Sequence, residues 1–170
     1  MPMKSKKKTK KKPEKKSKKS HSVQKRLEYF LEQAMKSPVL RKMGPKRRPW
    51  ESAVRLVDAR EMKRLNQSFR GKAYATDVLS FPLPPHFFEL KGWVHIGELV
   101  ICESVMKAQA KEQGHSVAEE LDVLTVYGLL HLLGFDHERS EKEAKLMRTW
   151  EAKLLGNKGL IERAQSDKHH

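Results

Sequence analysis

The chain has 170 residues, a length that suits one domain with a tail, and its 36 lysines and arginines outnumber 21 acidic residues to give a net charge of +15. The single cysteine, Cys102, excludes an internal disulfide framework and a cysteine-rich zinc module, and it fits a reducing compartment. No apolar run is long enough to cross a membrane, and the basic N-terminus is not followed by the apolar stretch of a secretory signal. We therefore expect a soluble cytoplasmic protein whose partners are polyanions.

The first twenty residues carry eleven lysines and one glutamate, a net charge of +10. Like charges repel, and no apolar residue follows Met3, so we expect residues 1–20 to be a disordered tail. Two roles are open for it: an arm that binds RNA phosphates without specificity, or a solubilising extension. Residues 157–170 are expected to form a flexible C-terminus, which leaves residues 21–156 as a single domain.

Apolar residues at helical spacing predict a helix over residues 22–36, with Ser22 as its N-cap and Ser37-Pro38 as its end. Residues 41–49 read as a basic loop, either a solvated connector or a surface that faces phosphate. Strands are predicted at residues 53–58, 77–81 and 94–102, with a helix capped by Asp58 after the first of them.

The rest of the chain reads as helices over residues 103–113, 116–133 and 140–155, which end at Gly114, Gly134 and Gly156. Strands come early and helices late, an order that is typical of an α+β domain. We expect a small mixed β-sheet packed against helices.

Candidate metal ligands stand at the end of the middle helix. Tyr127 and His131 are four residues apart and share one helix face. Gly134 can adopt the left-handed conformation that ends a helix, and the chain can then return His137 toward the same face. Offsets of 0, 4, 7 and 10 are those of the zinc helix in metzincin proteases. The spacing therefore predicts a zinc site at the end of a helix.

Two residues depart from a metalloprotease. Gly128 stands where a protease carries its general-base glutamate, which disfavours a zinc peptidase. Tyr127 occupies the first ligand position, and because a phenol has a reference pKa of about 10, a metal would have to drive its deprotonation. The sequence leaves Tyr127 open as a ligand or as an ordinary packing aromatic.

The segment from Gly128 to His137 resembles the H-G-x-L-H-L-x-G-x-D-H signature of the YbeY endoribonuclease family, with Tyr127 in place of the first histidine. Residues 66–72 and 76–82 are similar to the family blocks N-x-x-[YF]-R and T-[DN]-V-L-S-F-P. Residues 96–101 resemble its strand L-G-D-I-x-I. The resemblance covers about residues 52–155, and three motifs in the right order make a chance similarity very improbable.

The resemblance implies an α+β fold with one zinc ion at the floor of a cleft. In this chain the three ligand positions are occupied by His131, His137 and Tyr127. It also implies a basic residue beside the metal, carried here by Arg70, with Lys72 as a further RNA contact. Arginine can hold two phosphate oxygens with its planar fork, although Arg70 could instead cap the carbonyl groups that end its helix. Asp136 could orient an imidazole as a carboxylate behind the ligands, or cap the helix that follows.

The activity implied by the resemblance is a metal-dependent hydrolase, an endoribonuclease that cleaves single-stranded RNA. The family acts in maturation of the 3′ end of small-subunit (16S) rRNA and in ribosome quality control, with rRNA and the small ribosomal subunit as partners. A zinc ion can activate water at neutral pH and stabilise charge on a phosphate. Because Tyr127 replaces a histidine, a weakened or silent ribosome-associated factor on the same fold is the alternative.

Overall fold

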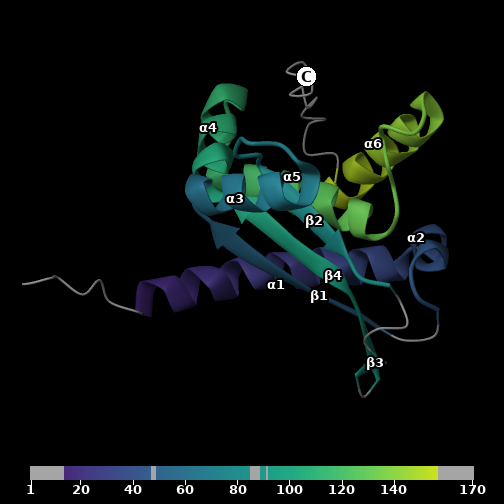
Figure 1. Cartoon of the computed structure of the whole chain (residues 1–170). Helices are drawn as coiled ribbons and strands as arrows, with labels where there is room; N and C mark the ends of the chain where they lie inside the picture. The colour runs from purple at the N-terminus through teal and green to yellow at the C-terminus, as the bar shows by residue number, and fades with distance from the viewer. Residues whose placement is uncertain (1–13, 47–48, 85–88, 91, 157–170) are drawn as a thin grey trace, which may run out of the picture.

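A computed structural model describes residues 14–46, 49–84, 89–90 and 92–156. Its elements follow one another in the order α1 (Glu14–Lys36), α2 (Pro38–Met43), β1 (Trp50–Val57), α3 (Ala59–Arg70), β2 (Val78–Pro82), β3 (Glu89–Leu90), β4 (Trp93–Cys102), α4 (Glu103–Gln113), α5 (Val117–Leu132) and α6 (Glu141–Leu155). One small sheet and its covering helices make up the fold (Figure 1), which confirms the α+β class. None of the helices in the described ranges is both long enough and apolar enough to cross a membrane.

The sheet is mixed and is centred on β4. Its strand order is β1-β4-β2, with β3 paired to the first residues of β4. β1 runs parallel to β4, whereas β2 and β3 run antiparallel to it. Successive side chains of a strand point to opposite faces, so β4 supplies both layers of the core. Leu99 and Ile101 join a large cluster with α1 and α5, and Val100 and Cys102 join a smaller one with α3.

Helix α5 is the central helix of the large cluster and is buried on most of its surface. It packs against α1, α4 and α6 as well as β2 and β4. Because these elements surround it, little of its surface faces solvent, and its sequence is apolar on most sides. Its N-terminus is fixed by a capping box, in which Ser116 and Glu119 bond each other's backbone N–H groups. The last two turns of this helix carry two of the predicted ligands, Tyr127 and His131.

Two N-terminal expectations are wrong. α1 begins at Glu14, so Ser22 lies inside the helix and residues 14–20, expected in the tail, are helical. Lysine is a good helix former, and Lys19 forms an ion pair with Glu103 at the start of α4. Ser37 ends α1 and also caps α2, because its Oγ accepts from the Leu40 N–H at 3.3 Å. Residues 1–13 and 157–170 lie outside the described residues.

The outer strand β1 is bonded to a side chain of α1. Gln24 Nε2 donates to the carbonyl of Ser52 at 2.9 Å, and Gln24 Oε1 accepts from the N–H of Val54 at 3.1 Å. These bonds fix the helix against the strand. The Asp58 cap predicted for α3 is confirmed, since its carboxylate accepts from the Glu61 N–H at 2.8 Å.

Candidate metal and RNA site

Three side chains from the zinc-like spacing meet at the C-terminal end of α5. The ring centroids of Tyr127 and His131 are 4.5 Å apart, and those of His131 and His137 are 5.4 Å apart. Tyr127 Oη lies 3.5 Å from His137 Nδ1. All three residues are half-buried, so their polar atoms can be reached from solvent.

The chain reversal after α5 returns His137 to this face. Gly134 has a φ of +93°, a conformation that favours glycine, and its N–H donates to the carbonyl of His131 at 3.0 Å. The next N–H, that of Phe135, donates to Leu130 at 3.1 Å, and the Phe135 side chain is buried in the core. Glycine and phenylalanine together fix the turn that brings the second histidine back.

One pair of donor atoms has a separation that suits a zinc ion. Two nitrogen or oxygen ligands on one tetrahedral zinc, each about 2.0–2.1 Å from it, lie about 3.4 Å apart. The 3.5 Å between Tyr127 Oη and His137 Nδ1 matches that separation. No group of three or more His, Cys, Asp or Glu side chains gathers in the described ranges. The candidate ligand set therefore consists of two imidazoles and the phenol of Tyr127.

Gly128 is required by packing as well as by sequence pattern. A Cβ atom built on it would lie 2.7 Å from Leu99 Cδ2 and 3.3 Å from Ser80 Oγ. Ser80 also donates to the Gly128 carbonyl at 3.2 Å. α5 therefore approaches β4 and β2 more closely than any side chain at this position allows. The glutamate of a metalloprotease would not fit here, which agrees with the sequence argument against a zinc peptidase.

Arg70 reaches the residue that follows His137. It is the last residue of α3, and its Nη2 is 3.9 Å from Oε1 of Glu138, the residue directly after His137. The predicted alternative, a cap for α3, is not needed, because the Gly71 N–H donates to Gln67 at 3.1 Å and the Lys72 N–H to Asn66 at 3.4 Å. Glu138 is not predicted from the sequence, in which its only signal is its place beside a candidate ligand.

Asp136 holds the turn that carries His137. Its Oδ1 accepts from the Glu138 N–H at 3.0 Å, and its Oδ2 lies 3.2 Å from Nε of Arg139. The cap of α6 is Ser140, which accepts from the Glu143 N–H at 3.2 Å, so the expectation that Asp136 caps this helix is wrong. The other expected role, orientation of an imidazole by Asp136, stays a prediction.

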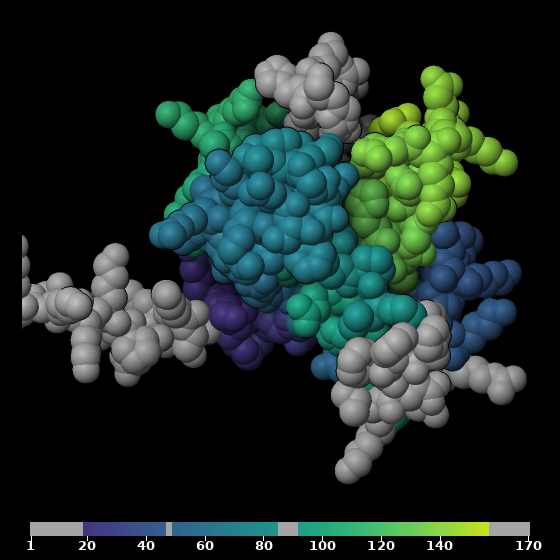
Figure 2. Space-filling model, in the orientation of Figure 1, coloured from purple at the N-terminus to yellow at the C-terminus, as the bar shows by residue number. Residues whose placement is uncertain are grey.

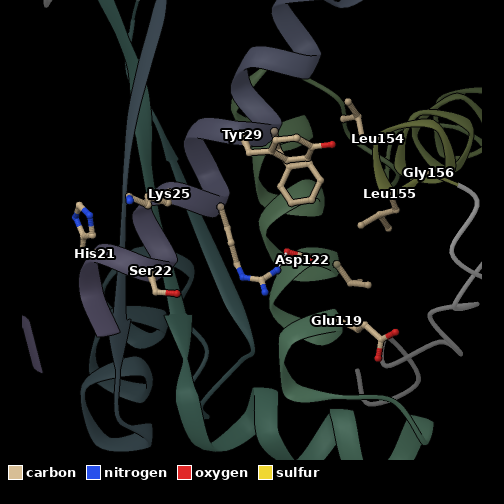
Figure 3. A pocket seen from close by; sticks show the side chains of 12 residues that line it. His21, Ser22, Lys25, Tyr29, Glu119, Asp122, Leu154, Leu155 and Gly156 are labelled. Carbon is tan, nitrogen blue, oxygen red and sulfur yellow. Dashed lines mark hydrogen bonds and ion pairs between the residues drawn. The ribbon is translucent and has the colours of Figure 1, made fainter. Parts of the chain in front are cut away.

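A hollow of about 730 Å³ lies elsewhere, between α1, α5 and the end of α6 (Figure 3). Tyr29, Asp122 and Leu155 are among its lining residues, and Asp122 forms an ion pair with Arg26. None of the candidate ligands lines it, and its charges are of both signs. The candidate ligands therefore lie at the surface at the end of α5 and not in this hollow.

The pKa values of two carboxyl groups are held below their ordinary range. A hydrogen bond from Arg64 lowers the pKa of Glu61 within α3. A hydrogen bond from Lys107, followed by one from Lys19, lowers the pKa of Glu103 at the start of α4. The second network ties the lysine-rich part of α1 to the first two turns of α4.

A comparison with known proteins decides the family. The model of the family described as endoribonuclease YbeY matches residues 8–159. The chain belongs to the YbeY endoribonuclease family. A YbeY endoribonuclease from Solibacter usitatus is 47% identical over 107 residues, which are 62% of this chain and 67% of that protein. One from Alkalilimnicola ehrlichii is 44% identical over 116 residues, 67% and 68% of the two chains.

A solution structure from Thermotoga maritima is 26% identical, covers 83% of this chain and 84% of its own, and has a TM-score of 0.45. The resemblance noted from the motifs is thus confirmed by the YbeY family model and by the curated relatives. The YbeY family consists of metal-dependent endoribonucleases that act in 3′-end maturation of 16S rRNA, and its members depend on zinc.

Proposed function

We propose that this chain holds one zinc ion between His131, His137 and Tyr127 and cleaves single-stranded RNA in the cytoplasm. Its substrate is the 3′ end of small-subunit rRNA, and its partner is the small ribosomal subunit. The observation that carries the proposal is the 3.5 Å between Tyr127 Oη and His137 Nδ1, beside the His131 ring. That separation suits two ligands of one ion.

A zinc ion bound there would supply Lewis-acid activation of water and of a phosphoryl oxygen. Arg70 supplies the second charge. Its guanidinium fork can hold two phosphate oxygens and offset the negative charge that grows on them during cleavage. In the free protein Glu138 sits 3.9 Å from this guanidinium, where its carboxylate takes the place of a phosphate. Bound RNA therefore has to displace Glu138 from Arg70.

The same 3.5 Å contact favours a second function. A phenol proton shared with His137 Nδ1 would occupy the lone pair that a metal needs. In that case the chain is a weakened or silent family member that still binds rRNA and the ribosome. Metal content separates the two proposals, because the first requires about one zinc per chain in the native protein.

The test is a zinc titration joined to a cleavage assay on single-stranded RNA, with and without added zinc. Tyr127→His adds a third imidazole one turn before His131, on the same helix face. Four-ligand zinc peptides bind with about 10–16 kcal/mol, so one ligand is worth roughly 3 kcal/mol, or about 100-fold in Kd. We expect Tyr127→His to bind zinc more tightly at neutral pH and to cleave RNA faster; the gain reaches about 100-fold only if the phenol contributes no bond to the metal in the wild type.

Tyr127→Phe is the matched control, because it keeps the ring and removes the oxygen. If the phenol is a ligand, Tyr127→Phe weakens zinc binding and the gain from Tyr127→His is smaller. His131→Ala should abolish binding in every background. Equal zinc affinity in wild type, Tyr127→His and Tyr127→Phe would show that position 127 does not belong to the metal site. Zinc-free wild-type protein that binds rRNA without cleaving it would support the second function.

A further inference from the structure

Phe69 is an exposed aromatic residue that the core does not require. It exposes 66% of its surface, more than any other large apolar side chain in the described ranges. Leaving a phenylalanine in water forgoes the stabilisation that its burial would give. Most of the Phe69 ring is therefore available to a binding partner.

The ring of Phe69 is held in place in spite of its exposure. Its centroid is 4.9 Å from that of Phe81 on β2, with the two planes at 72° in an edge-to-face contact. Phe81 in turn packs on the smaller core cluster with Leu79 and Val100. The contact engages one side of Phe69 and leaves most of it open. Phe69 is therefore a rigid surface ring with few degrees of freedom to lose on binding.

Phe69 also lies beside the proposed phosphate contact. It precedes Arg70, whose guanidinium is next to Glu138, the residue that follows His137. The surface of α3 and the segment after it meets the surface of the α5–α6 turn along one face of the molecule (Figure 2). Because Arg70 is the last residue of α3, an RNA strand with a phosphate on Arg70 would reach the end of that helix.

We propose that Phe69 stacks on an unpaired base next to the phosphate held by Arg70, and so makes the site select single-stranded RNA; this rests on the proposed function. Single-stranded RNA can splay a base onto an aromatic ring, whereas a duplex keeps its base faces covered by stacking. Stacking is tolerant of sequence, because every base has a π-face. Phe69 therefore selects single-stranded over double-stranded RNA and does not select a base sequence.

The experiment separates stacking from phosphate contact. Binding of zinc-free protein is measured by fluorescence anisotropy with two labelled oligomers of equal length: oligouridylate, and the same ribose-phosphate chain without bases. Loss of one stacked base costs about 5- to 100-fold in affinity. We expect Phe69→Leu to weaken binding of oligouridylate by this factor and to leave the abasic oligomer unchanged. Arg70→Ala should weaken both oligomers by the same factor.

Phe69→Tyr and Phe69→Trp keep an aromatic face and should restore the preference for bases. Tyr29→Ala is the matched control, because Tyr29 is an exposed aromatic on α1 and outside the proposed site. If Phe69→Leu binds both oligomers as wild type does, the stacking role is wrong while the proposed function stands. If wild type binds neither oligomer and cleaves no RNA, the proposed function fails and the stacking role with it. An equal loss on both oligomers would overturn stacking and indicate a distortion of Arg70.

Discussion

Gly128→Ala on α5 should have two opposing effects on stability: a gain in helix propensity and a loss from steric overlap with Leu99. Alanine in place of glycine within a helix stabilises it by about 1 kcal/mol. The new Cβ would lie 2.7 Å from Leu99 Cδ2, and Leu99 is fully buried, so it has no free space to move into. Overpacking of this kind costs about 1–3 kcal/mol. The net expectation is a loss of roughly 1 kcal/mol in the free energy of unfolding, or about 3 °C in Tm for a chain of this size.

Chemical denaturation followed by circular dichroism measures this loss. Ala108→Gly, at an exposed position inside α4, measures the difference in helix propensity between alanine and glycine where no packing changes. In a Leu99→Ala background the clash is removed, so Gly128→Ala should stabilise by about 1 kcal/mol. The reasoning is refuted if Gly128→Ala is stabilising in the otherwise wild-type chain, or if its cost is the same with and without Leu99.

Arg70→Ala should lower RNA cleavage by about 100-fold or more while the fold and the bound metal are kept, and cleavage at the wild-type rate would exclude the phosphate contact. Deletion of residues 1–13, which carry seven lysines, should weaken RNA binding and flatten its salt dependence; an unchanged slope would show that this segment does not touch RNA. The pKa of Glu103 is lowered by Lys107 and Lys19, so its stabilisation is present above the unfolded-state pKa and is lost as pH falls through the lowered value. For this partly exposed group the loss is less than about 1 kcal/mol. The protection of amides near Lys19, taken relative to the intrinsic exchange rate at each pH, should fall on acidification and in Glu103→Gln at neutral pH; protection that stays the same in both would disprove the link.

Local sequence signals are sufficient to predict where the C-terminal helices end. Gly114 and Gly156 adopt left-handed conformations at the ends of α4 and α6, as their sequence positions indicate. The spacing of Tyr127, His131 and His137 likewise predicted that these side chains meet, because helix geometry and one glycine turn fix it. Each of these features depends on residues that are close in sequence.

The features that the sequence did not predict are of two kinds. Some depend on contacts between residues far apart in the chain, and one depends on a residue pair that is found both at the end and at the start of helices. α1 starts early in a lysine-rich segment, where Lys19 pairs with a glutamate 84 residues later. Ser37-Pro38 was interpreted only as a helix stop, although serine before proline also starts a helix. The contact between Arg70 and Glu138 arises because α3 packs next to the α5–α6 turn, which no local pattern encodes.

The bonds of Gln24 to β1 have a consequence for how the molecule behaves among its neighbours. β1 is the outermost strand on its side of the sheet, and an open strand edge is a template for pairing with another chain. The amide of Gln24 offers one donor and one acceptor to Ser52 and Val54, as a residue of an added strand would. The middle of this edge is thus closed from within the chain. The backbone groups of Ser52 and Val54 are therefore not available to pair with a strand of another copy.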